Sequence, residues 1–124
     1  MRSAFAAISG SFKATISLVI ELLRYQSEDG REPFTEWIER VRDKVAQARI
    51  RIRLRQVESG NFGDCEPVGE GVIELRVHVG AGYRVYCARH GRAVVVLLCG
   101  GDKGSQAADI IRAKRLWLDW KRRQ

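Results

Sequence analysis

The chain has 124 residues, 45% of them hydrophobic, which is typical of one globular domain with a sizeable core. Its 22 lysines and arginines outnumber 15 acidic residues, and the net charge of +7 favours a polyanionic partner such as nucleic acid. No apolar run approaches the roughly 18 residues that a membrane helix needs. We therefore expect a soluble protein with no membrane partner.

The three cysteines, Cys65, Cys87 and Cys99, form no Cys-x-x-Cys pair, and no histidine lies at a zinc-ligand spacing from them. This pattern favours a reducing compartment, the cytoplasm, and disfavours a metal site. Cys87 and Cys99 fall in apolar runs, where cysteine usually acts as a small buried hydrophobe. We expect no metal, no cofactor and no thiol chemistry.

The amino-terminal segment differs in character from the rest of the chain. Residues 1–16 contain no acidic side chain and are expected to form an extension outside the domain, either disordered or derived from an upstream start codon. Residues 17–25 are rich in Val, Ile and Leu and end at a polar segment with turn character, which predicts a first strand. The single domain is therefore expected to span residues 17–124.

Two helices are predicted next. Pro33 suits a first helical turn, and the following apolar residues recur at helical spacing up to a break near Asp43. Residues 44–60 fit either a half-exposed strand, because isoleucine and leucine alternate with arginine, or a helix packed on the sheet. The length of the pattern and Gly60 at its end favour the helix. Arg49 and Arg53 would then lie on its rim, as solvated side chains or, alternatively, as groups that grip a phosphate.

The stretch from Gly71 to Gly101 organises the chain. After a loop expected at 61–71, it holds three β-type runs separated by turns at 80–82 and 90–91. In the first two runs, alternation gives one apolar face and one solvated face with Glu74, Arg76, His78, Arg84 and Tyr86. The third run, 93–99, is nearly all apolar, as in a strand that is covered on both faces.

The sheet is expected to end within residues 100–105, and a final helix is predicted from about Gln106. Ile110, Ala113, Trp117 and Trp120 recur on one side of this helix, which favours a packing role for both tryptophans. The predicted fold class is α+β: an antiparallel-rich curved sheet of about four strands, with two N-terminal helices and a C-terminal helix packed against one face.

Several short motifs follow one another in a specific order and spacing. They are Pro33-Phe34 with Trp37, Gly60-Asn61-Phe62-Gly63-Asp64, Pro67-Val68-Gly69-Glu70-Gly71-Val72, Glu74-Leu75-Arg76, Gly82-Tyr83-Arg84-Val85-Tyr86, and Leu97-Leu98-Cys99-Gly100-Gly101-Asp102-Lys103. Through these motifs the chain resembles the HigB-like addiction-module killer proteins, the phage-derived Gp49-like branch of the RelE/ParE toxin superfamily. The resemblance extends over most of the chain beyond residues 1–16.

The resemblance implies a RelE/ParE-like fold and a toxin of a type II toxin–antitoxin system. The implied activity is metal-independent endoribonuclease cleavage of mRNA, typically on the translating ribosome. The implied partners are a cognate antitoxin, usually a helix-turn-helix protein, the ribosome and mRNA, with DNA reached only through the antitoxin complex. We expect the antitoxin to neutralise the basic face or to cover its rim, along the C-terminal helix.

Candidate catalytic residues follow from the chemistry of metal-free RNA cleavage, which needs cations for the phosphate oxygens and carriers for two protons. Arg84 matches the family arginine that grips the scissile phosphate, and its planar fork suits bidentate contact. Arg76 shares its predicted face, and Lys103 could reach the same phosphate from the end of the last strand. His78 could act as a general acid or base, or be a bystander. Tyr86 could orient the 2′-hydroxyl or stack on a base, or be a core tyrosine.

Two departures from the family pattern bear on function. Val79 and Ala81 replace the Tyr-Gly-Pro-Gly turn usual before the Gly-Tyr-Arg motif, and no tyrosine lies between Lys103 and Arg112 where RelE ribonucleases carry one. Two alternatives to the ribonuclease therefore stay open. One is a non-enzymatic inhibitor of DNA gyrase of the ParE type, and the other is a degenerate module that only binds the antitoxin.

Overall fold

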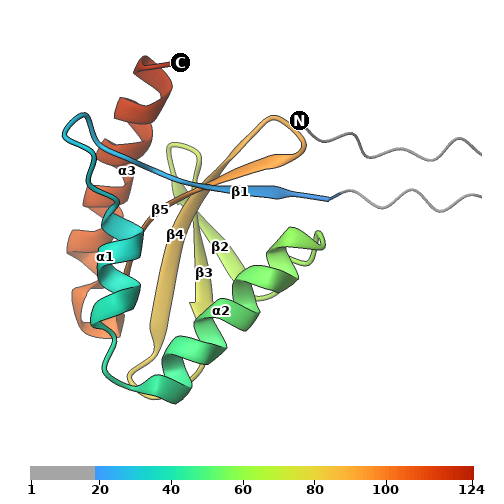
Figure 1. Cartoon of the computed structure of the whole chain (residues 1–124), viewed down its shortest axis with the longest axis vertical. Coiled ribbons are helices and arrows are strands. Elements are labelled where there is room, and N and C mark those ends of the chain that lie inside the picture. Colours follow the sequence, from blue (N-terminus) through green and yellow to red (C-terminus); the bar gives the residue numbers. More distant parts are fainter. Residues whose placement is uncertain (1–18) are drawn as a thin grey trace, which may run out of the picture.

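The computed structural model describes residues 19–124, so the extension expected at 1–16 lies outside the described residues. The chain forms one sheet and three helices (Figure 1), in the order β1 (Glu21–Arg24), α1 (Pro33–Arg40), α2 (Lys44–Glu58), β2 (Cys65–Gly69), β3 (Val72–Val77), β4 (Tyr83–His90), β5 (Val94–Asp102), the short 3₁₀ helix η1 (Lys103–Ser105) and α3 (Gln106–Arg122). Within this described range, no helix combines the length and the apolar character that crossing a bilayer requires.

The sheet has five strands in the order β1-β5-β4-β3-β2, with β1 parallel to β5 and every other pair antiparallel. This confirms the α+β class, but the expected number of about four strands is wrong. The additional strand is β2, which lies in the segment expected to be a loop. Pro67 and the surrounding glycines gave that segment its loop character, yet a proline is tolerated in β2 because the strand lies at the edge of the sheet.

Helices cover both faces of the sheet, so the expectation that all three pack against one face is wrong. One core contains side chains of α1 and α2 with Leu75, Val85 and Leu97 of the sheet. A second core, on the opposite face, joins α3 to Tyr86, Val96 and other residues of the sheet. The face predicted to be solvated is therefore covered by α3 along most of its length, and only its end near the β3–β4 turn stays open.

The α2 helix resolves the ambiguity of residues 44–60. Asp43 caps its first turn, because the side chain accepts hydrogen bonds from the backbone N–H groups of Val45 and Ala46 at 3.0 and 3.1 Å. Gly60, with φ of 92°, follows its last turn as predicted. The buried stripe contains Ala46, Ile50, Leu54 and Val57. The alternating arginines therefore reflect a helix with one apolar side.

Strand β5 continues past the apolar run through Gly100 and Gly101 to Asp102, and so ends within residues 100–105, where the sheet is expected to end. A Cβ atom added at Gly100 would lie 2.2 Å from the Trp37 ring of α1, and one added at Gly101 would lie 1.8 Å from the Asp109 carboxylate of α3. The two glycines therefore let helices approach the strand closely from both faces. A β-bulge between Tyr86 and Cys87 of β4 shifts the register with β5 in the same region.

We expect Gly100→Ala to destabilise the fold by about 1–3 kcal/mol, because the new methyl group would overlap the Trp37 ring. The loss should be smaller in a Trp37→Leu background, which makes room for the methyl group. Urea denaturation of the two single variants and the double variant measures this coupling. Equal losses in both backgrounds would contradict the proposed clash.

Candidate functional site

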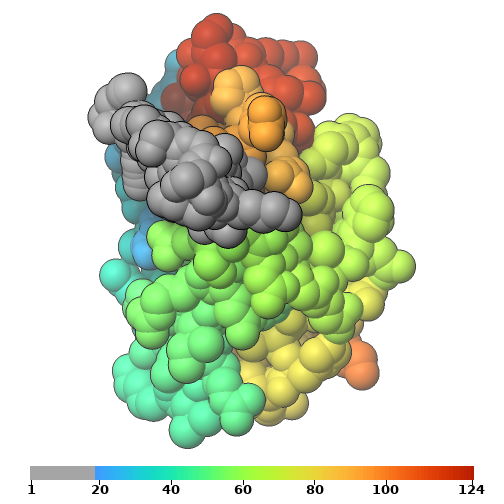
Figure 2. Space-filling view, turned by 90° about the vertical axis from the view of Figure 1, so that its right-hand side faces the viewer, coloured from blue at the N-terminus to red at the C-terminus, as the bar shows by residue number. Residues whose placement is uncertain are grey.

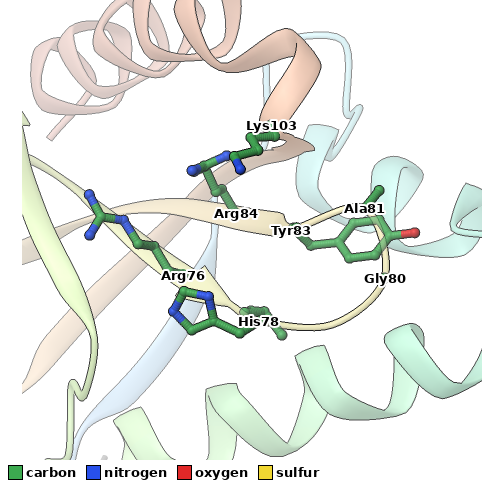
Figure 3. Close-up of a pocket in the computed structure, with 9 residues that line it drawn as sticks. Arg76, His78, Gly80, Ala81, Tyr83, Arg84 and Lys103 are labelled. Atoms are coloured by element: carbon green, nitrogen blue, oxygen red, sulfur yellow. The ribbon is translucent and has the colours of Figure 1, made fainter.

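A hollow of about 310 Å³ opens at the end of the sheet where β3 turns into β4 (Figure 3). Four of its lining residues are the predicted catalytic set: Arg76, His78, Arg84 and Lys103. The remaining wall consists of Val77, the turn residues 80–82 and Tyr83. The structure thus brings together all four side chains that the sequence had placed in one candidate site.

Backbone geometry explains this convergence. Arg76 of β3 and Arg84 of β4 are direct cross-strand partners, and both lie on the sheet face toward α3. The turn between them uses Gly80 and Gly82, whose φ values of 55° and 80° suit glycine. Lys103 follows Asp102, whose side chain accepts a hydrogen bond from the Gly104 N–H at 2.8 Å and so begins η1 at the sheet end.

Two arginines directly opposite each other would repel, and a buried carboxylate offsets this repulsion. Glu74 is only 1% exposed, and its Oε1 lies 3.2 Å from Arg76 Nε and 3.6 Å from Arg84 Nε. Its Oε2 accepts hydrogen bonds from Tyr86 Oη at 3.1 Å and from Gln106 Nε2 at 2.9 Å. Glu74 therefore joins β3, β4 and the first turn of α3 at the base of the hollow.

Arg84 is a largely buried cation whose hydrogen-bond donors are incompletely paired. Its side chain is 13% exposed, and Nε and Nη1 are buried without a hydrogen-bond partner among the described residues. Within residues 19–124 its single ion pair, with Glu74, is long at 3.6 Å. A guanidinium that lines an open hollow and is incompletely paired is suited to bind an oxyanion.

Arg76 differs from Arg84 because three carboxylates surround it. It contacts Glu66, Glu74 and Asp64, and the hydrogen bond with Glu66 is the main reason that the pKa of Arg76 is raised. Its charge is therefore largely compensated. Arg76 is better placed to hold the wall of the hollow than to supply net positive charge.

His78 lies at the mouth of the hollow, 74% exposed, with Nε2 against Asp64 Oδ2. This hydrogen bond is the largest cause of the lowered pKa of Asp64, and the nearby charge of Arg76 lowers that pKa further. The Asp64 carboxylate thus fixes one ring nitrogen of His78. An imidazole oriented in this way can exchange a proton through its other ring nitrogen.

Lys103 is exposed and makes no ion pair or hydrogen bond through its side chain within residues 19–124. Its stem lies beside Gly82, since a Cβ atom added there would be 3.9 Å from two Lys103 carbons. Lys103 and Arg84 therefore line one hollow from η1 and β4 with little compensating charge (Figure 3).

The structure places the predicted substrate-binding residues Tyr86, Arg53 and Arg49 in different environments from the catalytic set. Tyr86 is fully buried under α3 and donates its hydroxyl hydrogen to Glu74. The prediction that it contacts substrate is therefore wrong, and the alternative of a core tyrosine holds. Burial raises the pKa of Tyr86, which keeps the phenol protonated as this bond requires.

Arg53 is buried as well, and it donates to the carbonyl oxygens of Arg76 at 3.0 Å and Asp64 at 2.7 Å. It braces the loop before β2 against β3, so a role in gripping substrate is wrong for this side chain. Arg49 is exposed and lines a second hollow of about 280 Å³ that shares Arg76, Val77 and His78 with the first. Figure 2 shows α2 (green) and the β3–β4 segment (yellow) next to each other on this face. Arg49 remains a candidate for contact with a longer ligand.

Glu74 and Asp64 are the site residues that the sequence reasoning missed. Glu74 carried one signal: it alternates with apolar residues in a strand and so shares a face with Arg76. Asp64 carried none, because its place beside His78 depends on the path of the loop before β2.

The described residues contain no cluster of three or more His, Cys, Asp or Glu side chains that could hold a metal ion. Burial raises the pKa of the Cys87 and Cys99 thiols to about 12, which makes both poor nucleophiles. The site therefore consists of cations, one imidazole and their carboxylate partners.

This combination of a mixed five-stranded sheet, helices on both faces and a cationic hollow at one sheet end defines a small α+β protein with a candidate anion-binding site. Residues 32–117 match the model of the Gp49-like phage-derived protein family, and the chain belongs to that family, which is the RelE/ParE-like toxin branch. The chain is also 43% identical over 83 residues to an uncharacterised protein of Haemophilus influenzae, covering 67% of this chain and 84% of that protein. Membership indicates a toxin–antitoxin toxin and implies an antitoxin partner.

We expect Glu74→Gln to lower the free energy of unfolding by about 1–3 kcal/mol, because it removes a buried charge between two arginines. Glu66→Gln is the matched control, since Glu66 pairs with the same Arg76 but is 57% exposed. Its unfolding curve should overlay that of the wild type. Chemical denaturation measures both, and equal losses would contradict the role given to Glu74.

We expect His78→Ala to raise the pKa of Asp64 toward its ordinary value, because the hydrogen bond from His78 is the main cause of its depression. A lowered folded-state pKa means that Asp64 stabilises the fold above the ordinary aspartate pKa, and that this contribution is lost as pH falls through the lowered value. NMR titration of the Asp64 carboxyl carbon measures the change. His90→Ala, at the other end of β4, should leave the titration unchanged.

Proposed function

We propose that this protein is a toxin that cuts mRNA as a metal-independent endoribonuclease on the translating ribosome, and that its cognate antitoxin neutralises it. The observation that carries the proposal is the Arg84 guanidinium, which lines a hollow with Lys103 and His78 and whose buried Nε and Nη1 have no hydrogen-bond partner within residues 19–124. A phosphodiester in this hollow would supply the oxygens that these cations lack. RNA provides both the phosphate and an internal nucleophile.

The proposed reaction is attack of a ribose 2′-oxygen on the adjacent phosphorus. The new O2′–P bond forms as the P–O5′ bond breaks, and the products are a 2′,3′-cyclic phosphate and a 5′-hydroxyl. The 2′-hydroxyl must lose a proton and the departing O5′ must gain one. No oxidant or other co-reactant is needed.

In this mechanism Arg84 binds the non-bridging phosphate oxygens and stabilises the charge that grows on them in the transition state. Lys103 supports the same oxygens or protonates the leaving O5′ from its position at η1. His78, oriented by Asp64, exchanges the second proton. Arg76 and Glu74 hold Arg84 and the strand ends in place, and so act as positioning residues.

We propose that a helix-turn-helix antitoxin covers the rim of the hollow along α3. Ile111 and Leu118 are large apolar side chains exposed on this helix, and they lie among arginines of the same helix. An acidic, partly apolar segment of the antitoxin would complement that surface. DNA would be reached only through the antitoxin.

The test is cleavage of a defined message on programmed ribosomes. Arg84→Ala should reduce cleavage by roughly 10²–10³-fold, because it removes a group that stabilises the transition state. Arg84→Lys should restore only part of the activity, since a lysine cannot form the bidentate contact. Arg51→Ala, an exposed arginine on α2, is the control and should cut like the wild type.

The thermal midpoint of each variant shows whether it is folded. The same assay on purified RNA in EDTA tests metal independence separately. Intact message with folded wild-type protein would contradict the ribonuclease. Accumulation of gyrase–DNA cleavage complexes, with translation unaffected, would instead select the gyrase inhibitor.

A further inference from the structure

A third hollow, of about 210 Å³, adjoins the cationic one at Tyr83. Its lining residues are Trp37, Arg40, Val41, Arg42, Tyr83 and Asp102. Tyr83 lines both hollows, so the two adjoin each other at this side chain. An RNA strand that leaves the cationic hollow past Tyr83 reaches the third hollow next.

Two aromatic rings line this third hollow. The centroids of Trp37 and Tyr83 are 6.3 Å apart, and the ring planes meet at 57°. Both side chains are only partly buried, although one edge of Trp37 packs on Gly100. Val41 adds a buried apolar contact. Flat, partly exposed rings around a small hollow suit a nucleobase, because each base has an apolar face that can stack.

The polar groups of the hollow are arranged differently from those of the cationic site. Asp102 is the cross-strand partner of Tyr83, so both side chains lie at the same sheet end on the α1 side. Asp102 Oδ1 accepts the Gly104 N–H, and the carboxylate forms a capping box with Ser105 at the start of η1. Arg40 and Arg42 are exposed at the rim.

A carboxylate oxygen inside the hollow disfavours a phosphate there but accepts a hydrogen bond from an amino group. Cytosine and adenine carry such an exocyclic amino group, whereas uracil carries a carbonyl oxygen in the same place. The rim arginines can contact the sugar–phosphate backbone of the same nucleotide. The hollow therefore combines a stacking surface, an acceptor for one base edge and a basic rim.

We infer that this hollow binds the base of the nucleotide next to the scissile phosphate, and that Asp102 selects a base that presents an amino group. The inference rests on the proposed function for the direction of the RNA. It assigns base stacking to Trp37 and Tyr83. These rings would take the role of the tyrosine that RelE ribonucleases carry between positions equivalent to Lys103 and Arg112.

The test is binding of the full-length protein to 2′-O-methyl hexanucleotides of cytosine or uracil, which cannot be cut because the attacking hydroxyl is blocked. Wild-type protein should bind the cytosine oligonucleotide roughly 10-fold more tightly, as expected for one hydrogen bond to a charged group. Asp102→Asn should remove or reverse this preference. Asparagine can still accept the Gly104 N–H, but it then presents an amide donor to the base.

Tyr83→Leu should weaken binding of both oligonucleotides by roughly 5- to 150-fold, the usual range for loss of one stacked base, and Tyr83→Phe should not. Trp120→Leu is the matched aromatic control, because Trp120 packs on His90 at the other end of β4. Fluorescence anisotropy measures all affinities, and thermal midpoints identify any unfolded variant.

Equal affinity for the two oligonucleotides in wild-type protein, no binding of either, or no effect of Tyr83→Leu would overturn the inference. Binding that depends on Tyr83 and Asp102 without any cleavage of cuttable RNA would uphold the base site while the proposed ribonuclease fails. If Tyr83→Leu and Asp102→Asn cut RNA at the same sites as the wild type, the proposed ribonuclease would stand and the base site would fail.

Discussion

The structure depends on one buried carboxylate. Glu74 lies at the junction of β3, β4 and α3, where it takes up hydrogen bonds and ion pairs from Arg76, Arg84, Tyr86 and Gln106. Burying a carboxylate is costly unless it is paired, and this one is paired from three elements at once. It permits two arginines to face each other across neighbouring strands. The cationic hollow exists because this pairing holds their side chains in position.

The same pairing separates structural charge from available charge. Arg76 is surrounded by carboxylates, and Arg53 is buried and donates to two backbone carbonyls, so neither offers an open and uncompensated charge to a ligand. The charges of Arg84 and Lys103 are less compensated and stay available to a ligand. A net charge of +7 therefore says less about function than the incompletely paired cations Arg84 and Lys103 at one sheet end of the described residues. Beside them, Trp37 and Tyr83 offer a surface of a different kind, flat and partly apolar.

Much of the fold could be predicted from local patterns. The strands β3 and β4, the helix break near Asp43 and the helical spacing of α1 to α3 depend on residues close in sequence, and these predictions are confirmed. The expectations that are wrong concern pairing and layering. Pro67 concealed an edge strand, and strand alternation did not reveal that α3 covers the second face of the sheet. In each case the partner that stabilises the segment lies far away in the sequence.

The sequence by itself determined the three helices and four of the five strands in their order, the absence of metal-ligand spacing, and the family motifs that carry Arg76, His78, Arg84 and Lys103. Only the tertiary structure decided what each charged or aromatic side chain does. An alternating strand pattern assigns residues to a face but does not reveal what covers that face. Because α3 closes over the predicted solvated side, Tyr86 became a core residue and Glu74 a buried anchor, while the end beyond α3 stayed open.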